Sequence, residues 1–219
     1  MADAPPGKLK PGILNAKSYD AGLRELAGRD RDLARLWAQF GTPPEWFRAP
    51  GFPTLIHIIL EQQVSLASAK VAFARLLSIA SPLTPERFLA LDDAELKRAG
   101  FSRQKTLYGR HLAEAVAEGR LNLEALAGLD DAEVKAELTR VKGIGSWTAD
   151  IYLLMSLRRP DAWPAGDLAL AVAMREVKRR AARPSPPELA ALAEAWRPWR
   201  AVGARLLWNY YLKRRHTAV

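Results

Sequence analysis

Apolar residues recur along the chain at the three- and four-residue intervals of amphipathic helices, and no segment alternates with the period of two expected of a half-buried strand. Asp92, Asp130 and Ser185 each stand three residues before a glutamate, a spacing typical of capping boxes at helix starts. The pattern therefore indicates an all-α fold. The expected helices cover residues 20–28, 30–40, 53–63, 66–79, 92–98, 102–118, 130–138, 146–157, 167–182, 187–196 and 199–214.

A short internal similarity accompanies these helices. Leu91–Leu96 recurs as Leu129–Val134, and each copy leads through a glycine turn into a longer helix. The first turn carries Arg98, Arg103 and Lys105, so its basic side chains are candidates for contacts with a phosphate backbone. A similarity of this length also arises by chance between two unrelated hairpins with acidic caps, and that remains the simpler interpretation.

The most informative stretch, residues 141–149, reads Val-Lys-Gly-Ile-Gly-Ser-Trp-Thr-Ala. Two glycines separated by one apolar residue predict a tight turn that side chains would obstruct. Helical periodicity resumes directly afterwards, so the first amides of the new helix lack partners within it and suit a phosphate oxygen. We expect a helix-hairpin-helix at about residues 138–150; a hairpin that needs its glycines only for shape is the alternative. The expected phosphate contacts are Lys142, Gly143, Gly145 and Ser146.

Composition narrows the class of partner. Lys and Arg number 33 against 24 Asp and Glu, a net charge of +9 with a pI near 10.0, which favours a polyanion such as nucleic acid or an acidic membrane. No apolar run reaches membrane-spanning length, and residues 1–12 lack the apolar core of a signal peptide, so we expect a short flexible tail there. The absence of cysteine excludes disulfides and cysteine-ligated iron–sulfur clusters. We expect a monomeric cytoplasmic protein, nucleoid-associated if bacterial, without a catalytic cofactor.

Four segments in order resemble one family. The hairpin is followed by a Pro- and Gly-rich loop and then Asp167, while residues 61–65 read Glu-Gln-Gln-Val-Ser and residues 195–200 read Ala-Trp-Arg-Pro-Trp-Arg, with Trp208 beyond them. In these features the chain resembles the helix-hairpin-helix (HhH-GPD) DNA glycosylase superfamily, most closely its AlkA-like, 3-methyladenine DNA glycosylase II branch. The resemblance spans roughly residues 20–215 and implies two helical lobes with double-stranded DNA bound in the cleft between them.

The same resemblance divides the chain into its lobes. A central lobe is expected at residues 51–159 and includes the hairpin. The second lobe is expected to combine residues 13–50 with residues 160–219.

Asp167 would by itself be interpreted as the N-cap of the helix that follows it. The resemblance implies that it is also the catalytic carboxylate. Cleavage of an N-glycosidic bond gives the sugar oxocarbenium character, which an anion can stabilise, and a carboxylate can also orient the attacking water. Asp150, within the hairpin helix, and Asp161, in the loop, are weaker candidates.

Trp147 decides the expected reaction class. Relatives that also cut the DNA strand carry a lysine here, which forms a Schiff base with the sugar, and tryptophan offers no such nucleophile. The resemblance therefore implies a monofunctional glycosylase that leaves an abasic site. The alternatives are a bifunctional glycosylase/lyase, against which Trp147 argues, and a non-catalytic DNA-binding module, against which Asp167 and Trp208 argue.

The resemblance also implies a base pocket. Purines alkylated at N3 or N7 carry a positive charge, which an aromatic face attracts. Ile151 stands where many relatives have a stacking tyrosine, so the range of substrates stays open. The expected pocket residues are Trp147, Trp208, Ile151 and Tyr152.

In the same family, the loop at residues 61–65 supplies a wedge that fills the stack when the damaged nucleotide swings out. This implies that Gln63 is the wedge and that Gln62 touches neighbouring bases. From the residues alone, Gln63 is equally the polar end of an apolar helix. The resemblance also places a monovalent cation, Na⁺ or K⁺, at the main-chain carbonyls of Thr139, Val141 and Ile144.

Overall fold

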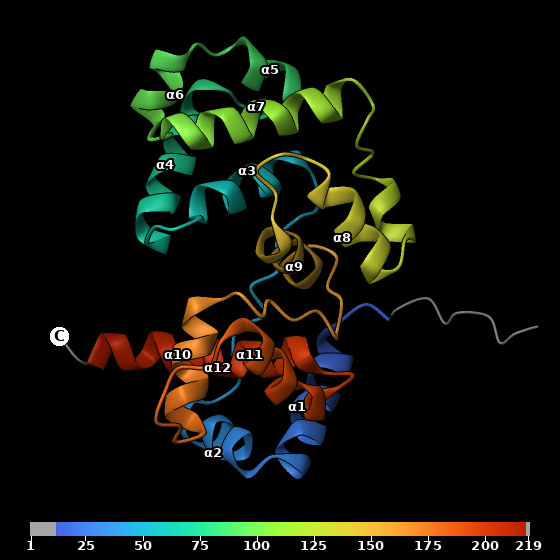
Figure 1. Cartoon of the computed structure of the whole chain (residues 1–219), viewed down its shortest axis with the longest axis vertical. Coiled ribbons are helices and arrows are strands. Elements are labelled where there is room, and N and C mark those ends of the chain that lie inside the picture. The colour runs from blue at the N-terminus through green and yellow to red at the C-terminus, as the bar shows by residue number, and fades with distance from the viewer. Residues whose placement is uncertain (1–11, 218–219) are drawn as a thin grey trace, which may run out of the picture.

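The computed structural model describes residues 12–217, where every regular element is a helix, as the sequence predicted (Figure 1). Apart from Gly12, the tail expected at residues 1–12 lies outside the described part. The α-helices are α1 (Ala16–Arg29), α2 (Arg31–Phe40), α3 (Phe52–Glu61), α4 (Leu66–Ile79), α5 (Pro85–Ala90), α6 (Asp93–Ala99), α7 (Arg103–Ala117), α8 (Asp131–Thr139), α9 (Ser146–Met155), α10 (Leu168–Val177), α11 (Pro186–Ala193) and α12 (Arg200–Thr217). Two 3₁₀ turns, η1 (Ala125–Gly128) and η2 (Glu194–Trp196), complete the set. Within the described residues, no helix is long and apolar enough to cross a membrane.

The differences from the expected helices have local causes. Helix α5 was not expected, because its six residues are too few to show a helical period; Thr84 caps it and Pro85 opens it. Helix α1 begins earlier than expected because Asn15 forms a capping box with Ser18. Helix α10 ends at Val177 and not near residue 182.

The helices form two lobes (Figure 1). Helices α3 to α9 make one lobe, and α1, α2 and α10 to α12 make the other. The chain segments of the second lobe attach at the C-terminal end of α9. There the Leu14 amide donates to the Arg158 carbonyl at 2.8 Å, and the Arg48 amide donates to the Met155 carbonyl at 3.0 Å.

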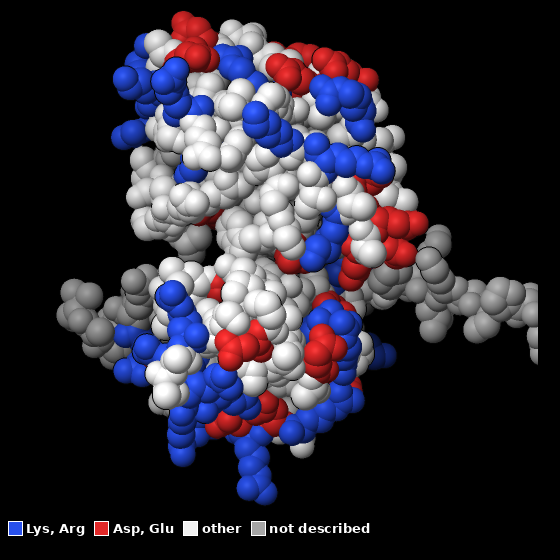
Figure 2. All heavy atoms as spheres, viewed as in Figure 1, with Lys and Arg blue, Asp and Glu red and all other residues white. Residues whose placement is uncertain are grey.

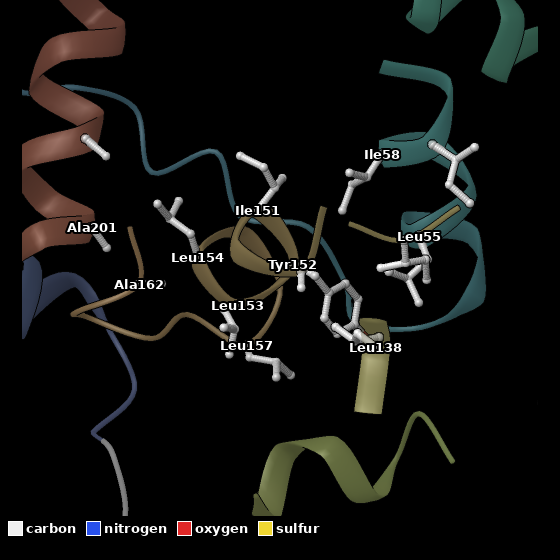
Figure 3. Packing of buried hydrophobic residues seen from close by; sticks show 14 of the residues in the cluster. Leu55, Ile58, Leu138, Ile151, Tyr152, Leu153, Leu154, Leu157, Ala162 and Ala201 are labelled. Atoms are coloured by element: carbon white, nitrogen blue, oxygen red, sulfur yellow. The ribbon is translucent and has the colours of Figure 1, made fainter. Parts of the chain in front are cut away.

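Helix α9 is the central helix of the molecule. All of its residues from Thr148 to Leu154 are buried, so it has no solvent-facing side over this stretch. Figure 3 shows Leu55, Ile58 and Leu138 on one side of α9 and Ala162 and Ala201 on the other. Most of these buried residues are apolar, and a helix with apolar residues on every side is stable only when enclosed in this way.

A buried arginine joins the second lobe to this helix. Arg205 of α12 is completely buried, and its guanidinium donates to the carbonyls of Glu45 at 2.8 Å, Ala201 at 3.0 Å and Leu154 at 3.0 Å. Burial lowers the pKa of Arg205 to about 10, so the side chain is still charged at neutral pH. One side chain thereby holds α12, the end of α9 and the connector at residues 43–50 together.

Replacing Arg205 with methionine should destabilise the protein markedly. The carbonyls of Glu45 and Leu154 would lose their donor inside the protein, and a buried unsatisfied carbonyl costs about 1–3 kcal/mol. We expect the free energy of unfolding to fall by about 3 kcal/mol in urea denaturation. The control, Arg214→Met, removes an exposed arginine of the same helix and should leave the free energy of unfolding nearly unchanged. Equal stability of the two variants would show that Arg205 is not the joint between these segments.

Candidate active site

Asp167 lies at the junction of the loop after α9 with helix α10, where it is the N-cap. Its Oδ1 accepts hydrogen bonds from the Leu170 amide at 2.9 Å and from the Trp208 indole Nε1 at 3.1 Å. Its Oδ2 accepts from the Trp147 indole Nε1 at 3.0 Å. Trp147 belongs to the first lobe, and Asp167 and Trp208 belong to the second. The carboxylate is therefore held between the lobes by neutral N–H donors.

These three donors orient the carboxylate without neutralising it. A carboxylate offers about four acceptor positions, and three are occupied here. The Asp167 residue is only half-buried, so the remaining acceptor capacity is open to a water or a substrate atom. Local sequence explains part of this arrangement: the Asp167 amide turns back to the Pro164 carbonyl at 2.9 Å, which places the side chain at the helix start.

The other two aspartates proposed from the sequence are paired with cations. The Asp150 carboxylate is buried and lies 2.8 Å from the Lys135 amine. Burial raises the pKa of the Asp150 carboxyl, and the ion pair with Lys135 offsets part of that rise. The Asp161 carboxylate accepts two hydrogen bonds from Arg200, at 2.8 and 2.9 Å. Both are thus committed to structural pairs, whereas Asp167 is held by neutral groups.

A third tryptophan lies beside Asp167's partner Trp208. The Trp46 ring meets the Trp208 ring edge-on, with 6.4 Å between centroids and 74° between planes. Trp46 is half-buried and adopts a left-handed backbone conformation with φ of 49°, an uncommon state for a residue with a side chain. The hydrogen bond from Arg205 to the neighbouring Glu45 carbonyl holds this backbone in place. Trp46 was not among the site residues expected from the sequence, where its signal is an aromatic residue in a Pro-rich, non-helical segment.

Two of the expected pocket residues lie in the core. Ile151 is 2% exposed and Tyr152 is fully buried, and the Tyr152 hydroxyl accepts a hydrogen bond from the Gly51 amide at 2.9 Å (Figure 3). The expectation that they line a base pocket is therefore corrected. They follow Trp147 by about one turn on a helix that is enclosed on every side, so their side chains pack against neighbouring helices.

The glycine turn joins α8 to α9 and has the features expected of a phosphate site. Gly145 is the N-cap of α9, and no side chain caps the first amides of this helix. Lys142, Gly145 and Ser146 are exposed. Gly143 has φ of 100°, and a Cβ atom there would lie 2.2 Å from Cγ of Tyr108 on α7. The turn thus packs closely on α7, and the first amides of α9 lie uncapped beside the exposed Gly145 and Ser146.

The two adjacent glutamines in the loop between α3 and α4 differ in where their side chains lie. Gln63 is exposed with φ of 57°, a position consistent with the expected wedge. The Gln62 side-chain amide instead donates to the Gly143 carbonyl and to the Thr148 hydroxyl, each at 3.0 Å. The N–H groups of Gln62 therefore face the hairpin, and its expected contact with DNA bases stays a prediction.

The remaining expected contacts are those of Arg103 and Lys105 with phosphate and those of three carbonyls with a cation. Arg103 is exposed at the start of α7. The Lys105 amine donates one hydrogen bond to the Leu60 carbonyl at 2.7 Å, and burial lowers its pKa. Its expected contact with a phosphate stays a prediction. Among the carbonyls expected to hold a cation, that of Val141 accepts from the Ile144 amide at 3.0 Å. The cation site stays a prediction.

The surface charge agrees with a polyanionic partner. Figure 2 shows Lys and Arg side chains on both lobes, interspersed with acidic ones, while much of the surface near their junction is uncharged. The face shown in Figure 2 therefore offers basic groups on both lobes.

Comparison with known proteins identifies relatives along most of the chain. A family model described as "HhH-GPD superfamily base excision DNA repair protein" matches residues 56–198. DNA-3-methyladenine glycosylase 1 of Schizosaccharomyces pombe is 31% identical over 201 residues, which cover 90% of this chain and 87% of that protein.

Solved structures show the same fold. The 3-methyladenine DNA glycosylase of S. pombe in complex with abasic DNA has a TM-score of 0.81 at 29% identity, covering 86% of this chain and 95% of that one. A DNA-3-methyladenine glycosidase from Bacillus halodurans has a TM-score of 0.73 at 28% identity, covering 89% and 91%.

The two glycines of the hairpin should respond differently to alanine. Gly143→Ala introduces a clash with Tyr108 in a left-handed conformation, so we expect it to lose at least about 2 kcal/mol of stability. Gly145→Ala meets nothing within 4 Å and should fold normally. Its methyl group would stand beside the outward amides and should weaken binding to any DNA sequence.

Thermal denaturation and fluorescence anisotropy at one fixed salt concentration measure these two effects. Wild-type DNA affinity in Gly145→Ala would contradict the assignment of the turn as the phosphate contact.

Proposed function

Since this chain belongs to the HhH-GPD superfamily of base excision DNA repair proteins, we propose that it hydrolyses the bond between an alkylated purine and its deoxyribose in DNA. The chain is thus a DNA glycosylase, and its reaction leaves an abasic site. The observation that carries the proposal is the Asp167 carboxylate, held between the lobes by two indole N–H groups and a helix amide.

The carboxylate acts on the sugar. As the C1′–N bond breaks, its electron pair leaves with the base and positive charge develops at C1′ and the ring oxygen. An ionised carboxylate facing the sugar stabilises that charge, and its open acceptor position can orient the water that attacks C1′. The proton lost by that water passes to the carboxylate or to solvent. Trp147 and Trp208 supply no proton in this scheme; they hold Asp167 in place.

The aromatic residues around Asp167 support a cationic substrate. Trp46 and Trp147 are half-buried, and Trp208 lies between Trp46 and the carboxylate. A purine methylated at N3 or N7 is positively charged, so aromatic faces attract it. The same charge weakens the glycosidic bond, so departure of the base needs no general acid. The names of the relatives, which are 3-methyladenine glycosylases, point to the same substrate class.

Access to the base requires that the nucleotide leave the double helix. The outward amides of the hairpin would hold a phosphate next to the target nucleotide, and the exposed Gln63 would enter the vacated stack. The S. pombe relative has been solved in complex with abasic DNA, which supports the proposal that base release from DNA leaves an abasic site. Asp167 and the tryptophans beside it come from one chain, so the protein can act as a monomer.

The central test is base release from DNA treated with a methylating agent, with Asp167→Asn as the diagnostic variant. Asparagine keeps an acceptor for the Leu170 amide but removes the negative charge. We expect excision to fall by at least about 100-fold, the scale of losing one transition-state electrostatic contact. Duplex binding should remain, because the hairpin is untouched.

The matched control is Asp20→Asn, an exposed aspartate of α1 that should excise like the wild type. Near-wild-type turnover by a folded Asp167→Asn protein would transfer the catalytic role to another group.

Strand cleavage separates the monofunctional proposal from its bifunctional alternative. With Trp147 where a Schiff-base lysine would stand, the backbone should stay intact until alkali or heat is applied. Borohydride added during turnover should trap no covalent complex, because no amine is positioned at C1′. A complex trapped at the rate of base release would overturn the proposal. A faint, slow adduct would not, because exposed lysines attack finished abasic sites.

A further inference from the structure

Three consecutive residues at the end of α3 are fastened to three different parts of the molecule. The Leu60 carbonyl accepts from the Lys105 amine of α7 at 2.7 Å. The Glu61 carboxylate accepts two hydrogen bonds from the Arg48 guanidinium, at 2.7 and 2.9 Å. The third residue, Gln62, is fastened to the hairpin. The three residues that precede position 63 are therefore each held in place by hydrogen bonds to other parts of the protein.

That next residue is Gln63, the expected wedge. It is exposed, and its left-handed φ of 57° is uncommon for a residue with a side chain. Such a backbone state persists only where the surroundings enforce it. The anchors at residues 60–62 supply that enforcement on its N-terminal side.

Gln62 connects this loop to the phosphate-binding turn itself. Its Nε2 donates one N–H to the carbonyl of Gly143, in the glycine turn, and the other to the hydroxyl of Thr148, in the first turn of α9. Thr148 is buried and Gly143 is half-buried, so Gln62 contacts the side of the hairpin that packs against the protein. The outward amides and the wedge are thus linked through one side chain.

We propose that Gln62 is a positioning residue that fixes the wedge Gln63 relative to the hairpin. This inference rests on the proposed function, in which the hairpin holds a phosphate and Gln63 fills the stack. A phosphate bound at the hairpin then places Gln63 at a set distance along the duplex. The hairpin can therefore bind the DNA backbone while Gln63 inserts into the base stack at the target position. Gln62 acts through Gln63 and does not need to touch a base.

Methionine is the informative replacement for Gln62. Its side chain has a similar length and no charge, but it offers no donor to the Gly143 carbonyl or the Thr148 hydroxyl. We expect Gln62→Met to lower kcat/KM on duplex DNA by about 30-fold, the scale of two lost hydrogen bonds. The loss on single-stranded DNA carrying the same lesion should be much smaller, because no stack must be filled.

A double-mutant cycle with Gln63→Ala provides the decisive measurement. If Gln62 acts through Gln63, then adding Gln62→Met to Gln63→Ala should cause little further loss on duplex DNA. A further loss equal to that of the single variant would overturn the proposal and return Gln62 to a direct contact with DNA. The control Gln39→Met, at an exposed glutamine of α2, should change neither substrate.

Two further measurements distinguish a loss of Gln63 positioning from misfolding of the variant and from a failure of the proposed glycosylase reaction. If Gln62→Met folds poorly, Thr148→Val replaces it as the test variant. This substitution removes only one of the two acceptors and should give a smaller loss of kcat/KM, confined to duplex DNA. A wild-type protein that releases no base would count against the proposed function alone. In that case, fluorescence of 2-aminopurine at the target position reports base extrusion directly. Extrusion should decrease in Gln62→Met, and unchanged extrusion would overturn the coupling.

Discussion

The complete enclosure of α9 is the constraint on which the rest of the structure depends. Residues Thr148 to Leu154 are buried, so the helix cannot shift without repacking both lobes. Its N-terminal end carries the glycine turn and Trp147. Its C-terminal end accepts hydrogen bonds from Arg48 and from the buried Arg205 of the second lobe. The position of the phosphate-binding turn relative to the second lobe is therefore set by one rigid element.

The groups that surround Asp167 at the junction of the lobes distinguish it from the other two candidate aspartates. Asp150 and Asp161 are paired with lysine or arginine, and their charge serves the fold. Asp167 is held instead by indole N–H groups from both lobes and by a helix amide. Such neutral donors fix the direction of a carboxylate and leave its charge to act on a substrate. Preorganised charge of this kind lowers the barrier for a reaction that develops positive charge nearby.

The sequence was informative about the site where the residues act through local geometry. Asp167 follows a loop that delivers it to a helix start, and Gly143 and Gly145 mark a turn with free amides; both features are present in the structure. The resemblance named Trp147 and Trp208 but gave no reason for their joint contact with Asp167. Trp46 was missed because its role depends on a ring 162 positions further along the chain, with which it shares no local pattern.

The sequence by itself determined the all-helical class, most helix positions and their caps, because these follow from contacts within a few residues. The tertiary structure decided which way each side chain points. Ile151 and Tyr152 were expected at a pocket, yet both are buried. Gln62 and Lys105 were expected at a DNA surface, and each donates a hydrogen bond to a carbonyl of a distant segment. A helical period identifies a buried face only when the opposite face meets solvent. For α9, which has no exposed face over its central residues, only the packing of both lobes could assign those directions.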